Sequence, residues 1–188
     1  MIGFIQQMIN GLSIGSVYAL MAVGYSLVYS IMNFSNFAHG GVIMIGSYIG
    51  FFCISLLNFS FPVAFVTAAL GSGILAIIVE RVAYNPLRKR NAPFLYFIIS
   101  AMGASIFLEN IVVATIGPTF RTYPPVFSAT PIQIGGLTIG RLDVLMFVIS
   151  AISLSILVYI IEKTKIGLAI RATSYSSKGS TLMGVNVD

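Results

Sequence analysis

The chain has 188 residues, of which 57% are hydrophobic and only 8% carry a charged side chain. A soluble domain would carry roughly a quarter charged residues, so this composition excludes one. Several apolar runs reach the ~20 residues that a helix needs to cross the hydrocarbon layer of a membrane. The sequence therefore predicts an all-α fold, a polytopic bundle of transmembrane helices surrounded by membrane lipid.

Five spans are predicted from the apolar runs, all within a single membrane domain. Polar and turn-forming residues separate them, with NFSFP after the second span and NPLRKRNAP after the third. The predicted spans cover residues 4–31, 38–57, 62–81, 93–116 and 142–161.

Polar and small residues indicate that the first two spans pack against other helices. Gln6, Asn10 and Ser13 share one face of the first span, at spacings of four and three. In lipid, small residues let helices approach closely, and polar side chains find partners across the interface. Pairs of glycines four residues apart follow the same logic in both spans, namely Gly11 with Gly15 and Gly46 with Gly50.

The stretch NFSNFAHGGV at residues 33–42 interrupts a segment that has no charged side chain before residue 80. It contains Asn33, Asn36 and His39, and Asn36 is placed to be the N-cap of the second span. Backbone groups at such a break lack helical partners, and polar side chains can supply them. We predict a polar joint between the first two spans.

The residues of this joint do not form a catalytic or metal site. His39 is the only histidine, whereas a metal site needs several His, Cys or carboxylate ligands. It also has no neighbouring acid and nucleophile with which to form a catalytic triad. Cys53 is the only cysteine, so we expect a buried thiol and no internal disulfide. The sequence predicts no catalytic residue, no bound metal and no cofactor.

Glu109 lies within the fourth predicted span, on one face with Ala101 and Ser105. A carboxylate at that depth is costly unless it is paired, protonated or beside water, so we expect it to face the bundle interior. Two roles stay open for it, as a structural hydrogen-bond partner or as part of a permeation path. Glu80 and Glu162 lie at span ends beside basic residues, where a solvated ion pair suffices.

The connector before the last span is expected to contain a small β-hairpin. After the proline-rich stretch PTFRTYPPVFSATP, the residues IQIGGLTI alternate in polarity about a Gly-Gly pair. Both turn residues of the favoured hairpin type need positive φ, which glycine adopts readily. We predict a hairpin at residues 132–139, which either shortens a loop between helices or helps to receive a partner.

The basic residues of the chain predict its orientation. They cluster in two connectors, 82–92 with its flanking Arg81 and 162–188, which the positive-inside rule assigns to the cytoplasm. The two connectors are two spans apart, so both assignments agree and place the N-terminus outside. The net charge of +5 therefore indicates membrane topology and no nucleic-acid partner.

Four stretches of the chain match motifs that occur in the same order in one transporter family. They are ALMAVGYSLVYSIMNFSNFAHGGVIMIGSYIG at 19–50, ERVAYNPLRKRNAP at 80–93, AMGASIFLEN at 101–110 and TKIGLAIRATSYSSKGSTLMGVNVD at 164–188. Together they resemble the permeases of the branched-chain amino acid ABC importers, over nearly the whole chain. The resemblance implies a non-catalytic, multi-pass permease domain of the cell inner membrane.

The same resemblance implies partners for the chain. Permeases of this family pair with a second, related permease and receive substrate from an external binding protein. Two cytoplasmic ATPase subunits power the pair, so ATP with magnesium is expected in those partners. Import of urea or short amides is an alternative within the family. An ion-coupled secondary transporter is an alternative from another class, and it would carry more acids within its spans.

Two groups of residues are expected to serve the transport function, and the resemblance implicates the first. The segment 164–188 resembles the element that docks into the ATPase, and its implicated residues are Arg171, Ala172, Leu182, Gly184 and Asn186. Our own hypothesis, which does not rest on the resemblance, is that four polar residues lie nearer the translocation path or its supporting joints than to lipid, namely Asn33, Asn36, His39 and Glu109.

The chain departs from the family pattern in the segment expected to dock. The family usually has an acid near position 176 and an alanine near 180, where this chain has Ser176 and Ser180. Losing the acid removes a potential contact to the ATPase, and Gly179 weakens a helix by up to ~1 kcal/mol relative to Ala. Family members also continue past this point with further spans. We therefore expect a fragment of a longer permease, or a truncated product that does not transport alone.

Overall fold

The computed structural model describes residues 2–32, 34–125, 132–134 and 137–185. Within these ranges, five helices are long and apolar enough to cross a membrane, and a two-stranded hairpin accompanies them. The predicted all-α polytopic fold is confirmed. By their contacts the residues form two compact units, unit 1 with residues 1–33 and 127–188 and unit 2 with residues 34–126. A single permease domain stays a prediction, and each unit is described by itself.

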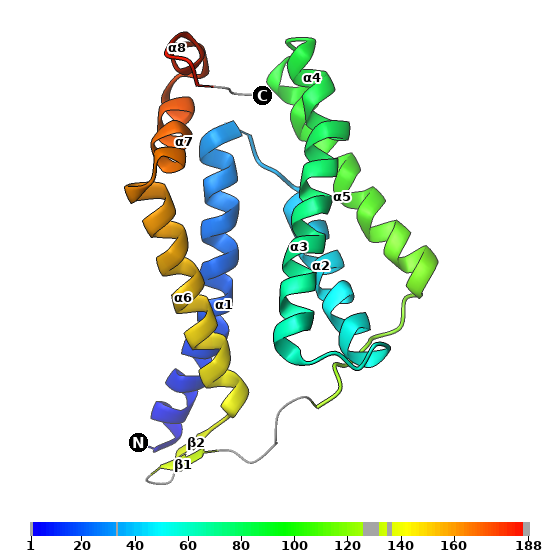
Figure 1. Cartoon of the computed structure of the whole chain (residues 1–188). Helices are drawn as coiled ribbons and strands as arrows, with labels where there is room; N and C mark the ends of the chain where they lie inside the picture. Colours follow the sequence, from blue (N-terminus) through cyan, green and yellow to red (C-terminus); the bar gives the residue numbers. More distant parts are fainter. Residues whose placement is uncertain (1, 33, 126–131, 135–136, 186–188) are drawn as a thin grey trace. The chain divides into compact units, whose positions relative to one another are not determined.

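Unit 1 is built on two long helices that pack along each other and run in the same direction (Figure 1). Helices α7 and α8 follow the second of them, and the predicted hairpin precedes it, with Ile132 paired to Ile139 and Ile134 to Leu137. The elements in chain order are α1 (Ile2–Met32), β1 (Ile132–Ile134), β2 (Leu137–Ile139), α6 (Arg141–Lys163), α7 (Lys165–Tyr175) and α8 (Ser177–Leu182).

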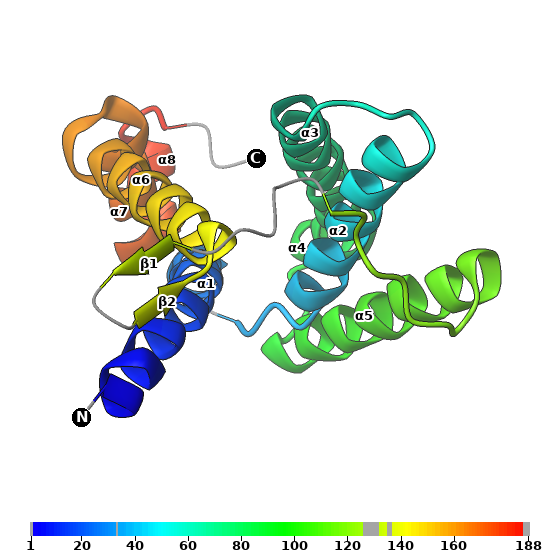
Figure 2. The same ribbon diagram turned by 90° about the horizontal axis from the view of Figure 1, so that it is seen from below.

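The hairpin is attached to the first turns of α1, and Figure 2 shows it beside that helix. The Gln6 side chain accepts a hydrogen bond from the Thr138 N–H at 2.8 Å and donates one to the Thr138 carbonyl at 2.6 Å. Its amide thus pairs with β2 as a neighbouring strand would. Gln6 also donates to Asn10 Oδ1 at 3.1 Å, as expected for polar residues on one face of the helix.

Replacing Gln6 by Ala is expected to loosen the hairpin. The variant loses both bonds to Thr138, each contributing about 1 kcal/mol when its groups can rehydrate. Faster hydrogen exchange at Thr138, with unchanged exchange in the middle of α1, is the expected result. Gln7→Ala is the matched control, since Gln7 is exposed and its side chain makes no hydrogen bond to the described residues. Equal exchange in both variants would contradict the role of Gln6.

Unit 2 is built around α2, which packs against α3 and α5. Its elements in chain order are α2 (Ala38–Ser55), α3 (Phe61–Val79), the π-helix η1 (Glu80–Tyr84), α4 (Asn85–Lys89) and α5 (Phe94–Ile116). The lone Cys53 is buried, as predicted, and its sulfur lies 3.3 Å from the Thr67 hydroxyl of α3. Tyr123 holds the segment after α5 against α2 by donating to the Ser47 carbonyl at 2.6 Å.

The predicted glycine contacts are confirmed in unit 2 and wrong in unit 1. A Cβ at Gly46 would lie 3.0 Å from the Ser72 Cβ, and one at Gly50 would lie 3.1 Å from the Tyr123 hydroxyl oxygen. By contrast, a Cβ at Gly11 or Gly15 would meet no atom within 4 Å. The glycines of α2 therefore permit close packing, whereas those of α1 leave space within unit 1.

The third span continues beyond its predicted end, and the connector predicted at residues 85–93 begins as helix α4. Pro86 has no N–H to donate to the turn before it, and its ring crowds that turn. The chain widens into η1 at this point, where the Asn85 N–H donates to the Glu80 carbonyl five residues back. Ser100 of α5 donates to the Ala83 carbonyl at 2.9 Å. The π-helix therefore lets a proline-containing segment remain helical.

Candidate functional site

Asn36, a residue of the joint predicted between the first two spans, binds two other residues of unit 2. Its side-chain oxygen accepts a hydrogen bond from the Tyr84 hydroxyl at 2.6 Å and another from the Ala38 N–H at 3.2 Å. The N-cap position of α2 is Phe37, one residue after the predicted cap. Because Phe37 has no side-chain acceptor, Asn36 supplies the capping bond from the preceding position.

Tyr84 forms the buried side of this joint, and sequence reasoning assigned it no role. It is 2% exposed, and its ring packs edge-on against Phe34 with the ring centroids 5.1 Å apart. Phe34 is equally buried and lies 5.2 Å from the Phe97 ring of α5. The sequence feature that could have identified Tyr84 is the motif ERVAYNPLR, in which the tyrosine follows Glu80 by four residues. This stretch forms the π-helix. The joint thus connects the start of α2 to η1 and α5.

The other residues expected at the joint or the path are placed differently. His39 is half-buried in the first turn of α2, and its N–H donates to the Asn36 carbonyl at 3.1 Å. Glu109 is exposed on α5 and accepts a hydrogen bond from Ser105 at 3.0 Å. It does not face the interior of unit 2, because the buried face of α5 is formed by Leu108 and its neighbours. Whether it faces the interior of the whole bundle stays a prediction. Asn33 lies outside the described residues.

Among the described residues, no three or more His, Cys, Asp or Glu side chains come together as metal ligands. The charged groups near the joint instead form a surface pair. Glu80 accepts from Arg88 at 2.6 Å, and both side chains are about a third exposed, at 34% and 35%. Exposed pairs of this kind contribute at most about 1 kcal/mol. This pair therefore fits the predicted solvated ion pair at a helix end.

The segment after α6 turns sharply at Thr164, which bonds to both helices that it joins. Its hydroxyl donates to the Ile160 carbonyl at 2.6 Å and accepts from the Gly167 N–H at 3.1 Å. A Cβ at Gly167 would overlap the carbonyl oxygens of Ile160 and Ile161. The corner between α6 and α7 can therefore form only if residue 167 has no side chain. The sequence analysis assigned no role to Gly167. The T-x-x-G spacing, with Thr164 three residues earlier, is the feature that could have identified it.

Helix α8 has defined caps at both ends. The Ser176 hydroxyl accepts from the Gly179 N–H at 3.1 Å, which makes Ser176 the N-cap. At the other end Gly184 has φ +84, with the Gly184 N–H bonded to Thr181 and the Val185 N–H bonded to Ser180. These two bonds and the left-handed glycine form a Schellman motif. Gly184 thus ends a short helix, a role for which the sequence makes a glycine suitable.

The remaining residues expected to dock lie on the surface of this segment. Arg171, Ala172 and Leu182 are exposed, and Leu182 is 87% accessible. Asn186 lies outside the described residues. Helix α7 is tied to the end of α1, where Ser174 donates to the Ser30 carbonyl at 2.6 Å. The segment therefore presents exposed basic and apolar side chains from a position fixed on unit 1.

A family model described as "Branched-chain amino acid transport system / permease component" matches residues 7–188. The chain belongs to this permease family. It is accordingly a multi-pass membrane protein, with five helices of sufficient length and apolarity among its described residues.

Individual relatives agree with the family match. The chain is 37% identical to the high-affinity branched-chain amino acid transport system permease protein BraD of Pseudomonas aeruginosa, over 97% of this chain. It is 37% identical to the corresponding protein LivH of Salmonella typhimurium and 35% identical to LivH of Escherichia coli, each over 98% of this chain. In all three comparisons it spans 63% of the relative's length. No solved structure matches the chain.

The departure of this chain from the family pattern at Ser176 has a structural explanation. Asp and Ser are both strong N-cap residues, because each offers a short side-chain oxygen to the first turn. Ser176 uses its hydroxyl in this way, so the exchange removes a negative charge while keeping the helix start. Gly179, next to the second departure at Ser180, lies within α8 beside the cap, where a Cβ would approach the Ser176 oxygen to 3.2 Å.

Changing Ser176 to Ala is expected to fray α8, whereas changing it to Asp is expected to preserve it. Loss of an N-cap costs about 1 kcal/mol, and an aspartate supplies an equivalent acceptor. Hydrogen exchange of the backbone at residues 179–183 measures the difference. Equal exchange in the Ala and Asp variants would show that the hydroxyl does not cap the helix.

Proposed function

We propose that the chain is the permease component of an ATP-driven importer for branched-chain amino acids in the cell inner membrane. It provides part of the translocation path and catalyses no reaction itself. A second permease, two cytoplasmic ATPase subunits that bind ATP and magnesium, and an external binding protein are its partners. The family match and the names of the relatives support amino acids over urea or short amides.

The observation that carries the proposal is the construction of the segment α7–α8. A connector that only joins spans needs no fixed shape, yet this one has a capped corner at Thr164, a capped start at Ser176 and a Schellman end at Gly184. Its exposed residues include Arg171 and Leu182. A rigid, basic element at the end of a transmembrane helix suits a docking element that transmits motion from an ATPase.

The proposed orientation places the N-terminus and the hairpin outside and α7 in the cytoplasm. Unit 1 supports opposite sides of the membrane for the hairpin and α7, because Gln6 binds the hairpin and Ser30 binds α7 at opposite ends of α1. The positive-inside rule then assigns α7 to the cytoplasm. The intervening residues extend about 36 Å at 1.5 Å per residue, close to the thickness of a bilayer core. The parallel course of α1 and α6 also fits the first and fifth spans (Figure 1).

The joint and Glu109 are proposed to line or support the path. Glu109 is exposed on unit 2, and an ionisable group within a span is unfavourable against lipid. Its face is therefore proposed to meet protein or water in the assembled importer, and the same assignment includes Asn33, Asn36 and His39. Unchanged leucine uptake by a normally expressed Glu109→Ala variant in the complete importer would contradict the role of Glu109.

Docking is tested by capturing the tagged chain from cells that co-express the candidate ATPase and second permease subunits. The ATPase subunits are expected to co-purify with the chain, and Arg171→Glu is expected to reduce their recovery strongly. Arg121→Glu is the matched control, since Arg121 is an equally exposed arginine in the connector assigned to the outside. Equal recovery in both variants would refute docking through α7.

Orientation is tested with the same two positions. In a Cys53→Ser background, Arg121→Cys is expected to react with a membrane-impermeant maleimide in intact cells. Arg171→Cys is expected to react only after the membrane has been permeabilised. The reverse pattern would overturn the proposed orientation.

A further inference from the structure

The π-helix η1 and helix α4 carry a group of basic residues at the end of the third span. One of them, Arg88, donates to Glu80 and is neutralised by it. Arg81, Lys89 and Arg90 are exposed, and their side chains make no hydrogen bond or ion pair to the described residues. This basic stretch, residues 81–90, therefore presents three positive charges that unit 2 does not neutralise.

The basic stretch lies where the third span leaves the hydrocarbon layer. A helix that begins at Phe61 has used the ~20 residues of a full crossing by about Glu80. Ser100 of α5 donates to the Ala83 carbonyl at 2.9 Å, so the first two turns of α5 lie beside this stretch. The three cations thus fall near the depth of the lipid headgroups, which long Lys and Arg side chains can reach.

Exposed apolar and aromatic side chains adjoin the three cations along the chain. Val82, next to Arg81, is 72% exposed. The first residues of α5 are each more than half exposed, namely Phe94, Leu95 and Tyr96. Tyrosine is typical of the membrane–water interface, because its ring is apolar and its hydroxyl is polar. A partner that covers this surface must therefore offer both negative charge and hydrocarbon.

We propose that the basic stretch binds the headgroups of anionic phospholipids through Arg81, Lys89 and Arg90. One lipid molecule supplies the negative charge with its headgroup and covers the start of α5 with its acyl chains. A zwitterionic headgroup brings no net charge, whereas basic clusters at a span end attract anionic lipid. An acidic protein surface would neutralise the cations but would leave the apolar side chains uncovered. The proposal goes beyond the proposed function, since it requires neither ATPase docking nor transport.

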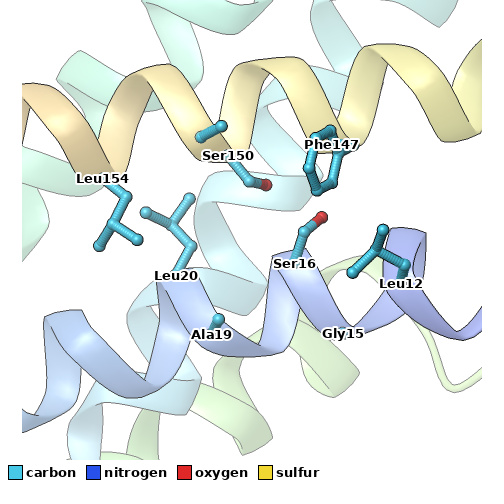
Figure 3. Close-up of a pocket in the computed structure, with 9 residues that line it drawn as sticks. Leu12, Gly15, Ser16, Ala19, Leu20, Phe147, Ser150 and Leu154 are labelled. Carbon is cyan, nitrogen blue, oxygen red and sulfur yellow. The ribbon is translucent and has the colours of Figure 1, made fainter.

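The hollow between α1 and α6 in unit 1 provides a contrast (Figure 3). Its lining includes Leu12, Phe147 and Leu154, and none of its lining residues, all within the described part of the chain, is charged. Such a surface does not distinguish one lipid headgroup from another. Selectivity for anionic lipid is therefore expected at the basic stretch of unit 2 and not at this hollow.

The test uses the fluorescence of a single tryptophan in the whole chain, reconstituted into vesicles. The chain has no tryptophan, so Tyr96→Trp places the only reporter beside the basic stretch. The vesicles mix brominated phosphatidylcholine with unbrominated phosphatidylglycerol, and bromine quenches the reporter only where phosphatidylcholine is its neighbour. We expect less quenching than the lipid ratio predicts, because phosphatidylglycerol is preferred. Quenching that follows the lipid ratio would overturn the proposal.

Loss of one cation should weaken this preference. Arg90→Gln, made in the Tyr96→Trp chain, is expected to lower the relative binding constant for phosphatidylglycerol about fivefold, since a basic residue near the surface contributes about 1 kcal/mol. Arg121→Gln is the matched control, because Arg121 is also an exposed arginine but lies outside the basic stretch. Equal effects of the two changes would show that only the net charge of the chain matters, and the site would be refuted.

Replacing all three cations should remove the preference altogether. Arg81→Gln, Lys89→Gln and Arg90→Gln are combined, while Glu80 and Arg88 keep their ion pair. Unchanged hydrogen exchange of η1 checks that this variant is folded, and Arg90→Gln alone decides if it is not. Raising KCl from about 0.1 M to about 1 M should also reduce the preference, because the screening length falls from about 10 Å to about 3 Å. A preference that survives the triple change or ignores salt would contradict the proposal.

Two other occupants of the basic stretch would give different results. If inorganic phosphate abolishes the preference more strongly than KCl of equal ionic strength, the cations bind free phosphate and the lipid site fails. If the triple variant retains the lipid preference but loses the ATPase subunits in the capture experiment, the stretch meets an acidic protein surface and the lipid site again fails. A lipid preference in a chain that recovers no ATPase subunits supports the lipid site and contradicts only the importer assignment.

Discussion

Gly167→Ala is expected to open the corner between α6 and α7. The new Cβ would overlap the carbonyl oxygens of Ile160 and Ile161. Both are backbone atoms at the end of α6, so no side-chain rotation can relieve the clash. The cost of such overpacking is on the order of 3 kcal/mol, and it should displace α7 from its contact with Ser30. We expect faster hydrogen exchange at residues 165–175 and reduced recovery of the ATPase subunits.

Gly103→Ala provides the comparison for this prediction. Gly103 also lies in a helix, but a Cβ there would meet no atom within 4 Å. Alanine favours a helix over glycine by roughly 1 kcal/mol, so this variant should be neutral or slightly stabilised within unit 2. Indistinguishable exchange of α7 in Gly167→Ala and the unaltered chain would show that the corner is looser than the structure describes.

Asn36→Ala is expected to destabilise unit 2 more than any other single change at the joint. The variant leaves the buried Tyr84 hydroxyl without its acceptor and removes the capping bond to the Ala38 N–H. An unsatisfied buried group costs about 1–3 kcal/mol and a lost cap about 1 kcal/mol, giving a loss of about 3 kcal/mol. Unfolding of the chain in mild detergent, followed by exchange of the α2 amides, measures it.

Tyr84→Phe separates the two contributions. It removes the phenol hydroxyl and leaves Asn36 free to cap α2, so a smaller loss of about 1 kcal/mol is expected. Combining it with Asn36→Ala should cost less than the two single changes added together, because no hydroxyl is then left unpaired. Strictly additive losses would mean that the 2.6 Å contact contributes no coupling between α2 and η1.

Local sequence predicted the elements whose formation depends on neighbouring residues. The apolar runs predicted five long helices because a bilayer imposes a minimum length on a span. The Gly-Gly pair between alternating residues predicted the hairpin, and Gly184 predicted the end of a short helix, because both rest on backbone conformations that glycine readily adopts. Asn36 was expected to be the N-cap of α2, whereas the N-cap is Phe37 and Asn36 accepts from the Ala38 N–H from one position earlier.

Local sequence predicted the candidate site only in part. A sequence locates a polar residue along the chain but does not show which side of a helix a particular fold buries. Only the packing of α5 on α2 shows that Leu108 is turned inward within unit 2 and that Glu109 lies on the exposed side of α5. Likewise, the sequence shows the motif around Tyr84 but does not show that Tyr84 binds Asn36, which lies 48 residues earlier.

The sequence by itself determined that this protein is a set of apolar membrane helices of one permease family, with breaks at defined places. Only the tertiary structure decided how those pieces are joined. The bond from Gln6 to Thr138 and the bond from Ser30 to Ser174 connect residues 132 and 144 positions apart. Whether a glycine lies against another helix, as Gly46 does, or beside open space, as Gly15 does, likewise depends on what lies opposite. Such features arise from atoms that meet only after folding, whereas hydropathy and turn preference act between neighbours along the chain.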